Sequence, residues 1–197
     1  MTIKGIIFDI GGVLIDYHNS WYIRYLSKKL GKKPDAIENA MYKPWVAFES
    51  GKITKADFEA RMAKALGAEP KDIRWFEFFK EMANTNEDAV GLVKDLHGRG
   101  YVTAVLSNID KARWSYVARM HWIALMDYRF ASCYIGLRKP QKAAYLYAAR
   151  KMDIAVDEIL FIDDKPENVA GARESGMHGI LFRSVRKLEA ELPKFGI

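Results

Sequence analysis

Short runs of apolar residues recur along the chain, and each ends at a polar residue or a glycine. The first run covers residues 4–8 and stops at Asp9, with Gly11 and Gly12 following, which predicts a buried strand and then a turn. Four further runs are rich in β-branched or aromatic residues and predict more strands. They cover residues 101–106, 130–134, 159–162 and 179–182. We therefore expect one parallel sheet, with Cys133 as a small core residue inside its third strand.

Helical patterns separate these predicted strands. The segments with apolar residues at helical spacing cover residues 86–98, 111–120, 140–152, 166–175 and 185–192. The first of them has a capping signature, Thr85 followed three residues later by Asp88. Alternating strands and helices predict an α/β fold, a doubly wound parallel sheet with helices on both faces. Ligands of such sheets bind at the carboxyl ends of the strands.

The stretch from residue 17 to residue 83 differs from its flanks, because it contains no convincing strand pattern. It predicts four or five helices instead, over residues 20–30, 34–41, 43–49, 54–66 and 70–82. We expect residues 1–16 and 84–197 to form an α/β core domain and residues 17–83 to form a helical cap domain. A cap inserted after the first strand would hang over the carboxyl ends of the sheet and exclude water from a bound ligand.

Charge and composition narrow the range of partners. The chain has 31 Lys and Arg residues against 25 Asp and Glu, a net charge of +6, and the two signs are interleaved without a basic block. We therefore expect a solvated, mixed-charge surface rather than one that binds nucleic acid, and small phosphorylated ligands are compatible with it. A single cysteine excludes an intrachain disulfide, and no apolar run reaches the ~18 residues that a membrane span requires. These features favour a soluble, unprocessed cytoplasmic protein, and they leave its oligomeric state open.

Three carboxylates stand just beyond two of the predicted strands. Asp9 follows the first strand, and Asp163 and Asp164 follow the strand over residues 159–162. Because parallel strands present their carboxyl ends at one edge of a sheet, we expect these acids to meet there and to repel one another unless a cation binds. Mg²⁺ suits a site with oxygen ligands only. An aspartate that merely caps the next helix is the alternative for any one of them, and three acids at two strand ends make it the weaker interpretation.

Other polar residues at the same edge complete a site for phosphoryl transfer. Ser107 and Asn108 follow the second strand and offer a hydroxyl and an amide to a phosphoryl oxygen. Lys139 stands at a predicted helix start, where a cation and backbone amides favour an anion. We add Gly12, in the turn after the first strand, to the residues expected to bind phosphate. Each feature alone is ordinary, and the combination predicts phosphoryl-transfer chemistry.

Four segments, in this order along the chain, resemble the motifs of the haloacid dehalogenase-like hydrolase superfamily. They are residues 8–16 (FDIGGVLID), 106–108 (LSN), 136–140 (GLRKP) and 161–168 (FIDDKPEN). The resemblance spans the whole chain, and the helical stretch between the first two motifs resembles the small helical cap of this superfamily. Within the superfamily, the chain is similar to the sugar-phosphatase branch related to glucose-1-phosphatases.

The resemblance implies a role for each matching residue. Asp9 would be the nucleophile that forms an aspartyl-phosphate, and Ser107 and Lys139 would hold the phosphoryl group. The Asp163–Asp164 pair would anchor Mg²⁺ together with Asp9 and the backbone carbonyl of Gly11. The implied activity is magnesium-dependent hydrolysis of a small phosphomonoester, with sugar phosphates as one candidate substrate class.

One position departs from the superfamily pattern. Most of its phosphatases carry a second aspartate two residues after the nucleophile as general acid, and here Gly11 occupies that position. Loss of a positioned general acid typically costs about 10²–10⁴-fold in rate. Three interpretations stay open: a phosphatase with a good leaving group or another acid, a 2-haloacid dehalogenase, or a protein that binds a phosphate ligand without turnover. The Asp163–Asp164 pair favours the phosphatase, because a dehalogenase has no use for magnesium.

Two residues at the end of the first motif are candidates for the missing acid. Asp16 and His18 lie where the chain enters the predicted cap, and an imidazole can donate a proton near neutral pH. The cap also carries many aromatic residues, most of which we expect in its own core. Trp45 in the cap and Trp114 outside it are our candidates for contact with the substrate.

Overall fold

The computed structural model describes residues 2–197 and contains a five-stranded parallel sheet. The strands are β1 (Gly5–Phe8), β4 (Val102–Ser107), β5 (Tyr128–Ala131), β6 (Ile159–Asp163) and β7 (His178–Leu181). In space they follow the order β5-β4-β1-β6-β7, which confirms the predicted α/β fold. Because β1 lies between β4 and β6, the polar residues that end these three strands come together at one edge of the sheet.

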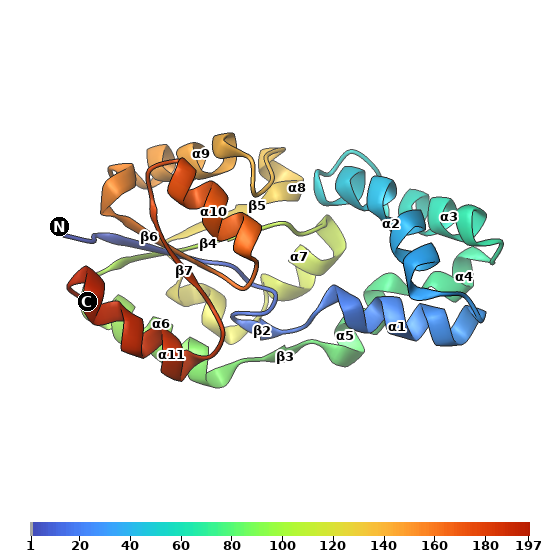
Figure 1. The fold of residues 1–197 in the computed structure, drawn as a ribbon, viewed down its shortest axis with the longest axis horizontal. Coiled ribbons are helices and arrows are strands. Elements are labelled where there is room, and N and C mark those ends of the chain that lie inside the picture. Colours follow the sequence, from blue (N-terminus) through green and yellow to red (C-terminus); the bar gives the residue numbers. More distant parts are fainter. Residues whose placement is uncertain (1) are drawn as a thin grey trace.

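Helices cover both faces of this sheet. They are α6 (Glu87–Gly98), α7 (Lys111–Val117), α9 (Lys142–Met152), α10 (Pro166–Glu174) and α11 (Val185–Glu191), with 3₁₀ turns η1 (His121–Leu125), η2 (Val156–Glu158) and η3 (Leu192–Phe195). Figure 1 shows α9 and α10 on one side of the sheet and α6 and α11 on the other. Successive residues of β1 point to opposite faces, so Ile6 and Phe8 join one apolar cluster and Ile7 joins the other.

A helical segment lies beyond the carboxyl ends of the strands (Figure 1). It contains α1 (Asn19–Leu30), α2 (Pro34–Glu49), α3 (Lys55–Leu66), α4 (Pro70–Ile73) and α5 (Trp75–Met82). The short strands β2 (Ile15–Asp16) and β3 (Asn84–Thr85) pair antiparallel where the chain leaves the sheet and where it returns. We call residues 17–83 the helical insertion, and their status as a separate domain stays a prediction.

Three of the helices predicted within the helical insertion have the wrong boundaries. Residues 34–49 form one helix, α2, instead of two, although Pro44 lies inside it. Four apolar side chains of α2 are buried, and this packing offsets the hydrogen bond that Pro44 removes. Residues 70–82 form two helices instead of one, because Arg74 adopts a left-handed conformation (φ 41°) between α4 and α5. No glycine or proline marks that break.

Several predicted elements of the core also end elsewhere. The strand expected over residues 130–134 stops at Ala131, and the chain continues as the short helix α8 (Ser132–Ile135). Cys133 therefore lies in a helix rather than in a strand, and it is buried as expected. The helix expected from residue 111 ends at Val117, and the one expected from residue 140 begins at Lys142. The sequence does not predict β2 and β3, because strands of two residues carry no periodic pattern.

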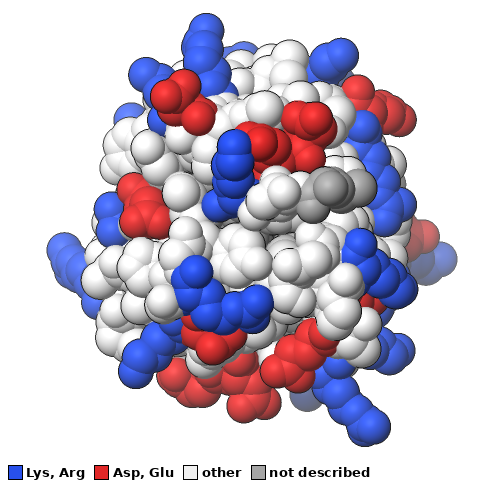
Figure 2. Space-filling view, turned by 90° about the vertical axis from the view of Figure 1, so that its left-hand side faces the viewer, with Lys and Arg blue, Asp and Glu red and all other residues white. Residues whose placement is uncertain are grey.

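Charged side chains of both signs are interspersed over the face shown in Figure 2, and no continuous basic surface is visible there. This agrees with the interleaving of charges along the sequence. No helix within residues 2–197 is both long and apolar enough to cross a lipid bilayer. The polar residues predicted to form the site, among them Asp9, Ser107 and Lys139, lie where the sheet meets the helical insertion.

Candidate active site

Asp9, Asp163 and Asp164 meet where β1 and β6 end. The two strands pair in parallel, and the backbone N–H of Asp9 donates to the carbonyl oxygen of Ile162 at 2.8 Å. One carboxylate oxygen from each aspartate lies within 4.8 Å of the other two. Asp9 and Asp163 are buried, and Asp164 is half-buried. The structure thus brings together the three acids that the sequence places at two strand ends.

Lys139 lies between two of these acids. Its Nζ is 2.9 Å from Asp9 Oδ1 and 2.5 Å from Asp163 Oδ2, and its side chain is almost completely buried. Burial alone lowers the pKa of Lys139, but the neighbouring Asp163 and Asp9 raise it above the ordinary lysine value. Lys139 therefore stays protonated and offsets part of the negative charge of the cluster.

Asp163 and Asp164 differ in their protein partners. Asn168 Nδ2 donates to both carboxylate oxygens of Asp163 at 3.0 Å, and the backbone N–H of Lys165 donates to one of them at 2.9 Å. Asp164 Oδ1, by contrast, is buried without a hydrogen-bond partner among residues 2–197. Burial, followed by the charges of Asp9 and Asp163, raises the pKa of Asp164 to about 6.

This acidic cluster fits a divalent cation with oxygen ligands. Three carboxylates against one ammonium leave the cluster negative, and the unpartnered oxygen of Asp164 is free to act as a ligand. A cation here would remove the repulsion that raises the pKa of Asp164. Mg²⁺ prefers carboxylate oxygens and keeps water and phosphate oxygens in its shell. Gly11 lines the same cavity as Asp9, and its carbonyl stays a predicted ligand.

Ser107 and Asn108 stand at the end of the neighbouring strand β4. Ser107 is buried and lines the cavity in front of the acids. The amide of Asn108 donates to the carbonyl oxygen of Lys139 at 2.9 Å, and its Oδ1 accepts from the backbone N–H of Lys139 at 2.9 Å. The side chain of Asn108 therefore holds the backbone of Lys139 with one of its two amide N–H groups, and because Asn108 also lines the cavity, its contact with phosphate stays a prediction.

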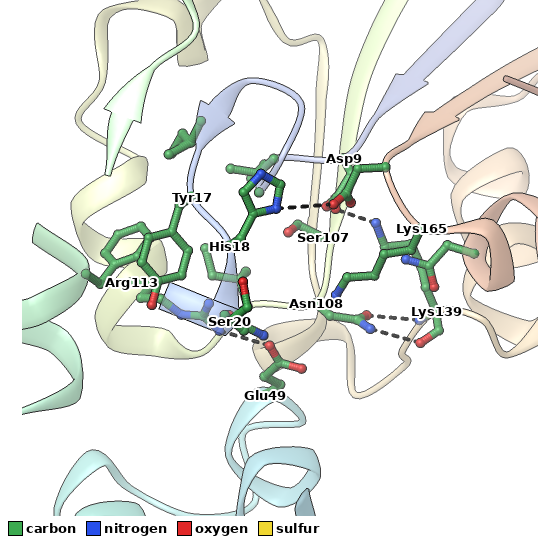
Figure 3. Close-up of a pocket in the computed structure, with 18 residues that line it drawn as sticks. Asp9, Tyr17, His18, Ser20, Glu49, Ser107, Asn108, Arg113, Lys139 and Lys165 are labelled. Carbon is green, nitrogen blue, oxygen red and sulfur yellow. Dashed lines mark hydrogen bonds and ion pairs between the residues drawn. The ribbon is translucent and has the colours of Figure 1, made fainter. Parts of the chain in front are cut away.

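A cavity of about 270 Å³ lies in front of the acidic cluster. Figure 3 shows Asp9, Ser107 and Lys139 on one side of it and Tyr17 and Arg113 on the other. The predicted site residues that line this cavity are Asp9, Gly11, His18, Ser107, Asn108, Lys139 and Asp164. The cavity therefore has a charged end in the core and a second end formed in part by the helical insertion.

Gly12, Trp45 and Trp114 do not line this cavity. Gly12 has φ +79°, and a Cβ there would lie 2.5 Å from an oxygen of Asp164, so this glycine allows the carboxylate to approach the turn. Trp45 is buried in the helical insertion, with its ring centroid 4.5 Å from that of Trp75. Trp114 packs against the apolar core. The structure therefore does not bring these three residues into the lining of this cavity, and the contacts of Gly12 with phosphate and of the two tryptophans with the substrate stay predictions.

The two candidates for the missing acid lie beside Asp164. His18 Nδ1 is 3.7 Å from Asp164 Oδ2, and His18 Nε2 is 3.9 Å from Asp16 Oδ1. His18 lines the cavity, whereas Asp16 is exposed in an adjoining groove. Of these two residues, His18 alone is placed to reach a ligand in the cavity, and its role as an acid stays a prediction.

A second charged cluster, which sequence reasoning missed, closes the far end of the cavity. Glu49, the last residue of α2, binds Arg113 through Oε1 at 2.9 Å and Arg138 through Oε2 at 2.7 Å. Arg113 Nε also lies 2.5 Å from Asp110 Oδ2. Burial lowers the pKa of Arg113, but Asp110 and Glu49 raise it above the ordinary arginine value. We call Glu49, Asp110, Arg113 and Arg138 the junction cluster, because it joins the helical insertion to the core.

Aromatic rings of the helical insertion surround Arg113. Its guanidinium carbon lies 4.9 Å from the ring centroids of Trp45 and Trp75 and 5.7 Å from that of Phe79. Trp45 thus makes a cation–π contact with Arg113. Glu49 is 64 and 89 residues from its two arginine partners, so no local spacing predicts the pairs. The available signal was a charged residue directly after Phe48 on the buried face of a predicted helix.

Comparison with known proteins assigns the chain to a family. A profile of haloacid dehalogenase-like hydrolases matches residues 3–176, and the chain therefore belongs to this family of hydrolases. The sesquiterpene phosphatase astK of Aspergillus oryzae is 31% identical over 182 residues, which cover 91% of this chain and 89% of that protein. Three further curated relatives are longer, and the matched regions cover 30–39% of their length.

Solved structures share the fold over most of their length. A predicted HAD-like family hydrolase from Porphyromonas gingivalis has a TM-score of 0.80 at 23% identity, over 98% of this chain and 99% of that one. A HAD family enzyme of Bacteroides thetaiotaomicron, solved in complex with magnesium and inorganic phosphate, has a TM-score of 0.75 at 22% identity, over 92% and 94%. At these identities the likeness concerns the fold.

Proposed function

We propose that the chain is a magnesium-dependent phosphatase that hydrolyses a small phosphomonoester through an aspartyl-phosphate on Asp9. The observation that carries this proposal is the ion pair of Asp9 with the buried Lys139, beside the Asp163–Asp164 pair and in front of a cavity. This set offers a carboxylate nucleophile, a fixed cation and a metal site, the parts that phosphoryl transfer requires. The names of a phosphatase relative and of a neighbour solved with magnesium and phosphate support the same chemistry.

The first step forms the aspartyl-phosphate. An oxygen of Asp9 attacks the phosphorus, and the bond between phosphorus and the leaving-group oxygen breaks. Lys139 offsets the charge that the phosphoryl oxygens bring next to Asp9, and the hydroxyl of Ser107 donates to one of those oxygens. Asp9 and the Asp163–Asp164 pair would hold Mg²⁺, which when bound supplies further stabilisation of the phosphoryl charge.

The second step releases orthophosphate. A water molecule attacks the phosphorus, the bond between phosphorus and Asp9 breaks, and the carboxylate of Asp9 is restored. Over the cycle the water loses a proton and the leaving-group oxygen gains one. Gly11 has no side chain to carry that proton, so esters with good leaving groups should react fastest unless His18 supplies it.

The helical insertion contributes the other end of the cavity, and we infer that it acts as a cap. Tyr17, Glu49 and Phe79 line the cavity from this segment. Tyr17 lies across the cavity from Asp9 and Lys139 (Figure 3), so a substrate with its phosphoryl group beside Asp9 would have its organic group against the helical insertion. A cap that covers the cavity in this way would exclude water from the reacting phosphoryl group.

Phosphate release from a panel of esters tests the proposal. The panel contains anomeric and non-anomeric sugar phosphates, a terpenyl phosphate and p-nitrophenyl phosphate, each with magnesium and with a chelator. We expect release that requires magnesium and that is lost in Asp9→Asn, which keeps the size of the side chain and removes its nucleophilic charge. An Asp9→Asn preparation, free of other phosphatases, that still released phosphate would remove Asp9 as the nucleophile.

The same panel separates the alternatives. A large preference for p-nitrophenyl phosphate over alkyl phosphates would indicate that no residue replaces the acid missing at Gly11. Halide release from a 2-haloacid, without phosphate release from any ester, would favour a dehalogenase. Binding of orthophosphate without either reaction would favour a protein that binds a phosphate ligand.

A further inference from the structure

We infer that Glu49 is a positioning residue, which couples the seating of the helical insertion to the placement of Lys139. The inference rests on the proposed function, where Lys139 matters as the partner of Asp9. Glu49 comes from the helical insertion and is 3% exposed. One of its contacts, with Arg138, leads to the segment that carries Lys139.

Glu49 binds the core through three of its oxygen atoms. Its Oε1 accepts from Arg113 and its Oε2 from Arg138, while its backbone carbonyl accepts from Ser132 Oγ at 2.6 Å. The side chains of Arg113 and Arg138 are 7% and 19% exposed. Loss of the carboxylate would leave two poorly hydrated guanidinium groups without this partner, which is unfavourable. The pairs therefore favour a single seating of α2 on the core.

Arg138 transmits this seating, because it directly precedes Lys139. The backbone of Lys139 is held on its other side by Asn108, through the two hydrogen bonds of 2.9 Å. Its ammonium then reaches Asp9 and Asp163. The segment is thus anchored at two consecutive residues, once to β4 through Asn108 and once to the helical insertion through Glu49. An error of about 1 Å in the placement of such a group can cost about 10²-fold in rate.

Close packing beside Glu49 leaves little room for the helical insertion to contact the core in a different position. Gly51, just after α2, has φ +70°, and a Cβ there would overlap the backbone carbonyl of Cys133 in α8. The backbone of the insertion therefore lies directly against the core at this point. Figure 3 shows Glu49 on the side of the cavity that faces Asn108 and Lys139.

Glu49→Gln is the variant that tests the inference, since it keeps the shape of the side chain and removes its charge. We expect kcat for the best ester of the panel to fall about 10- to 100-fold. Orthophosphate should also become a weaker competitive inhibitor, because it binds the same lysine. Arg138→Gln should give the same loss, the double variant should be little worse than either single one, and Arg138→Lys should restore part of kcat.

Hydrogen exchange gives a readout that does not depend on activity. The backbone amides of Leu137, Arg138, Lys139 and Gln141 should exchange faster in Glu49→Gln and Arg138→Gln than in the wild type. Tyr22→Phe is the matched control, because the buried Tyr22 hydroxyl donates to the carbonyl of Ile73, and both residues belong to the helical insertion and not to the junction cluster. It should lower the melting temperature and leave kcat and this exchange unchanged.

The outcomes separate the two proposals. If Glu49→Gln lowers the melting temperature but leaves kcat and the amide exchange around Lys139 unchanged, Glu49 has a structural role only. This result would overturn the inference. A wild type that releases no phosphate from any ester would defeat the proposed function, while the exchange measurement would still decide on Glu49. Should Glu49→Gln not fold, Arg138→Gln and Arg138→Lys provide the same comparison.

Discussion

Lys139 is the residue on which the electrostatics of the candidate site depend. Its side chain is 1% exposed and lies between Asp9 and Asp163, which are themselves buried. A buried ion pair is stable only while each charge keeps its partner, so the lysine and the two acids have to be placed together. Asn108 serves this placement by holding the backbone of Lys139. The candidate site thus depends on Asn108, which acts on the acids through the backbone of Lys139.

Cys133 shows how burial acts on a neutral group. Burial, followed by the charge of Asp110, raises the pKa of its thiol to about 11. The thiolate is the reactive form, so we expect iodoacetamide at pH 8 to label Cys133 slowly in the folded protein and rapidly in urea. Mass spectrometry of the alkylated protein measures both rates. Equally fast labelling with and without urea would show that the thiol is accessible in the folded chain.

The sign of the pH effect follows from the direction of the same shift. The pKa of the Cys133 thiol is higher in the folded chain than its ordinary value of 9.0. The folded state therefore favours the neutral thiol, and its contribution to stability is complete below about pH 9 and lost as the pH rises toward 11. Cys133→Ala should flatten the loss of stability in that pH range.

At the scale of elements, the sequence predicts β1, β4 and β6 because each is an apolar run closed by polar residues. Their parallel pairing then brings Asp9, Ser107 and the Asp163–Asp164 pair to one edge, so the charged end of the cavity is predictable. The break between two helices at Arg74 and the ion pairs of the junction cluster cannot be predicted in this way. Both depend on how the helical insertion packs, and the partners of Glu49 lie 64 and 89 residues away from it.

The close approach of α2 to α8 leads to a prediction about two glycines. Gly51 and Gly31 have similar left-handed backbones, with φ +70° and +62°, so alanine at either costs about 1–2 kcal/mol. A Cβ at Gly31 has no atom within 4 Å from the described residues beyond its chain neighbours, whereas one at Gly51 overlaps the carbonyl of Cys133. We expect Gly51→Ala to lower the free energy of unfolding more than Gly31→Ala does. Urea unfolding measures both, and equal losses would mean that α2 and α8 do not meet closely in solution.

At the scale of the whole molecule, two charged clusters join parts of the chain that are distant in sequence. The acidic cluster joins β1 to β6, and the junction cluster joins the helical insertion to the core. Arg138 belongs to the junction cluster, and Lys139, the next residue, forms ion pairs with the acidic cluster. Binding at the charged end of the cavity and seating of the helical insertion therefore act on the same short segment.

Magnesium should stabilise the whole chain, because its proposed ligands Asp9 and the Asp163–Asp164 pair are far apart in sequence and come together only on folding. A ligand that binds the folded chain alone stabilises it by about 2.7 kcal/mol at a concentration of 100 Kd. We expect the melting temperature of the wild type to rise with magnesium and to fall back with a chelator.

Asp164→Asn should separate two effects of the Asp164 charge: destabilisation of the metal-free folded state and binding of magnesium. The pKa of Asp164 is raised to about 6, so its charge disfavours the metal-free folded state increasingly as the pH rises from about 4 to 6, and fully at pH 7.5. The metal-free variant should therefore melt later than the metal-free wild type, and it should gain less from magnesium because one ligand charge is gone. Asp95→Asn, at an exposed residue that pairs with Arg99, should change neither value. A magnesium-dependent rise in melting temperature that is equal in Asp164→Asn and the wild type would exclude Asp164 as a ligand.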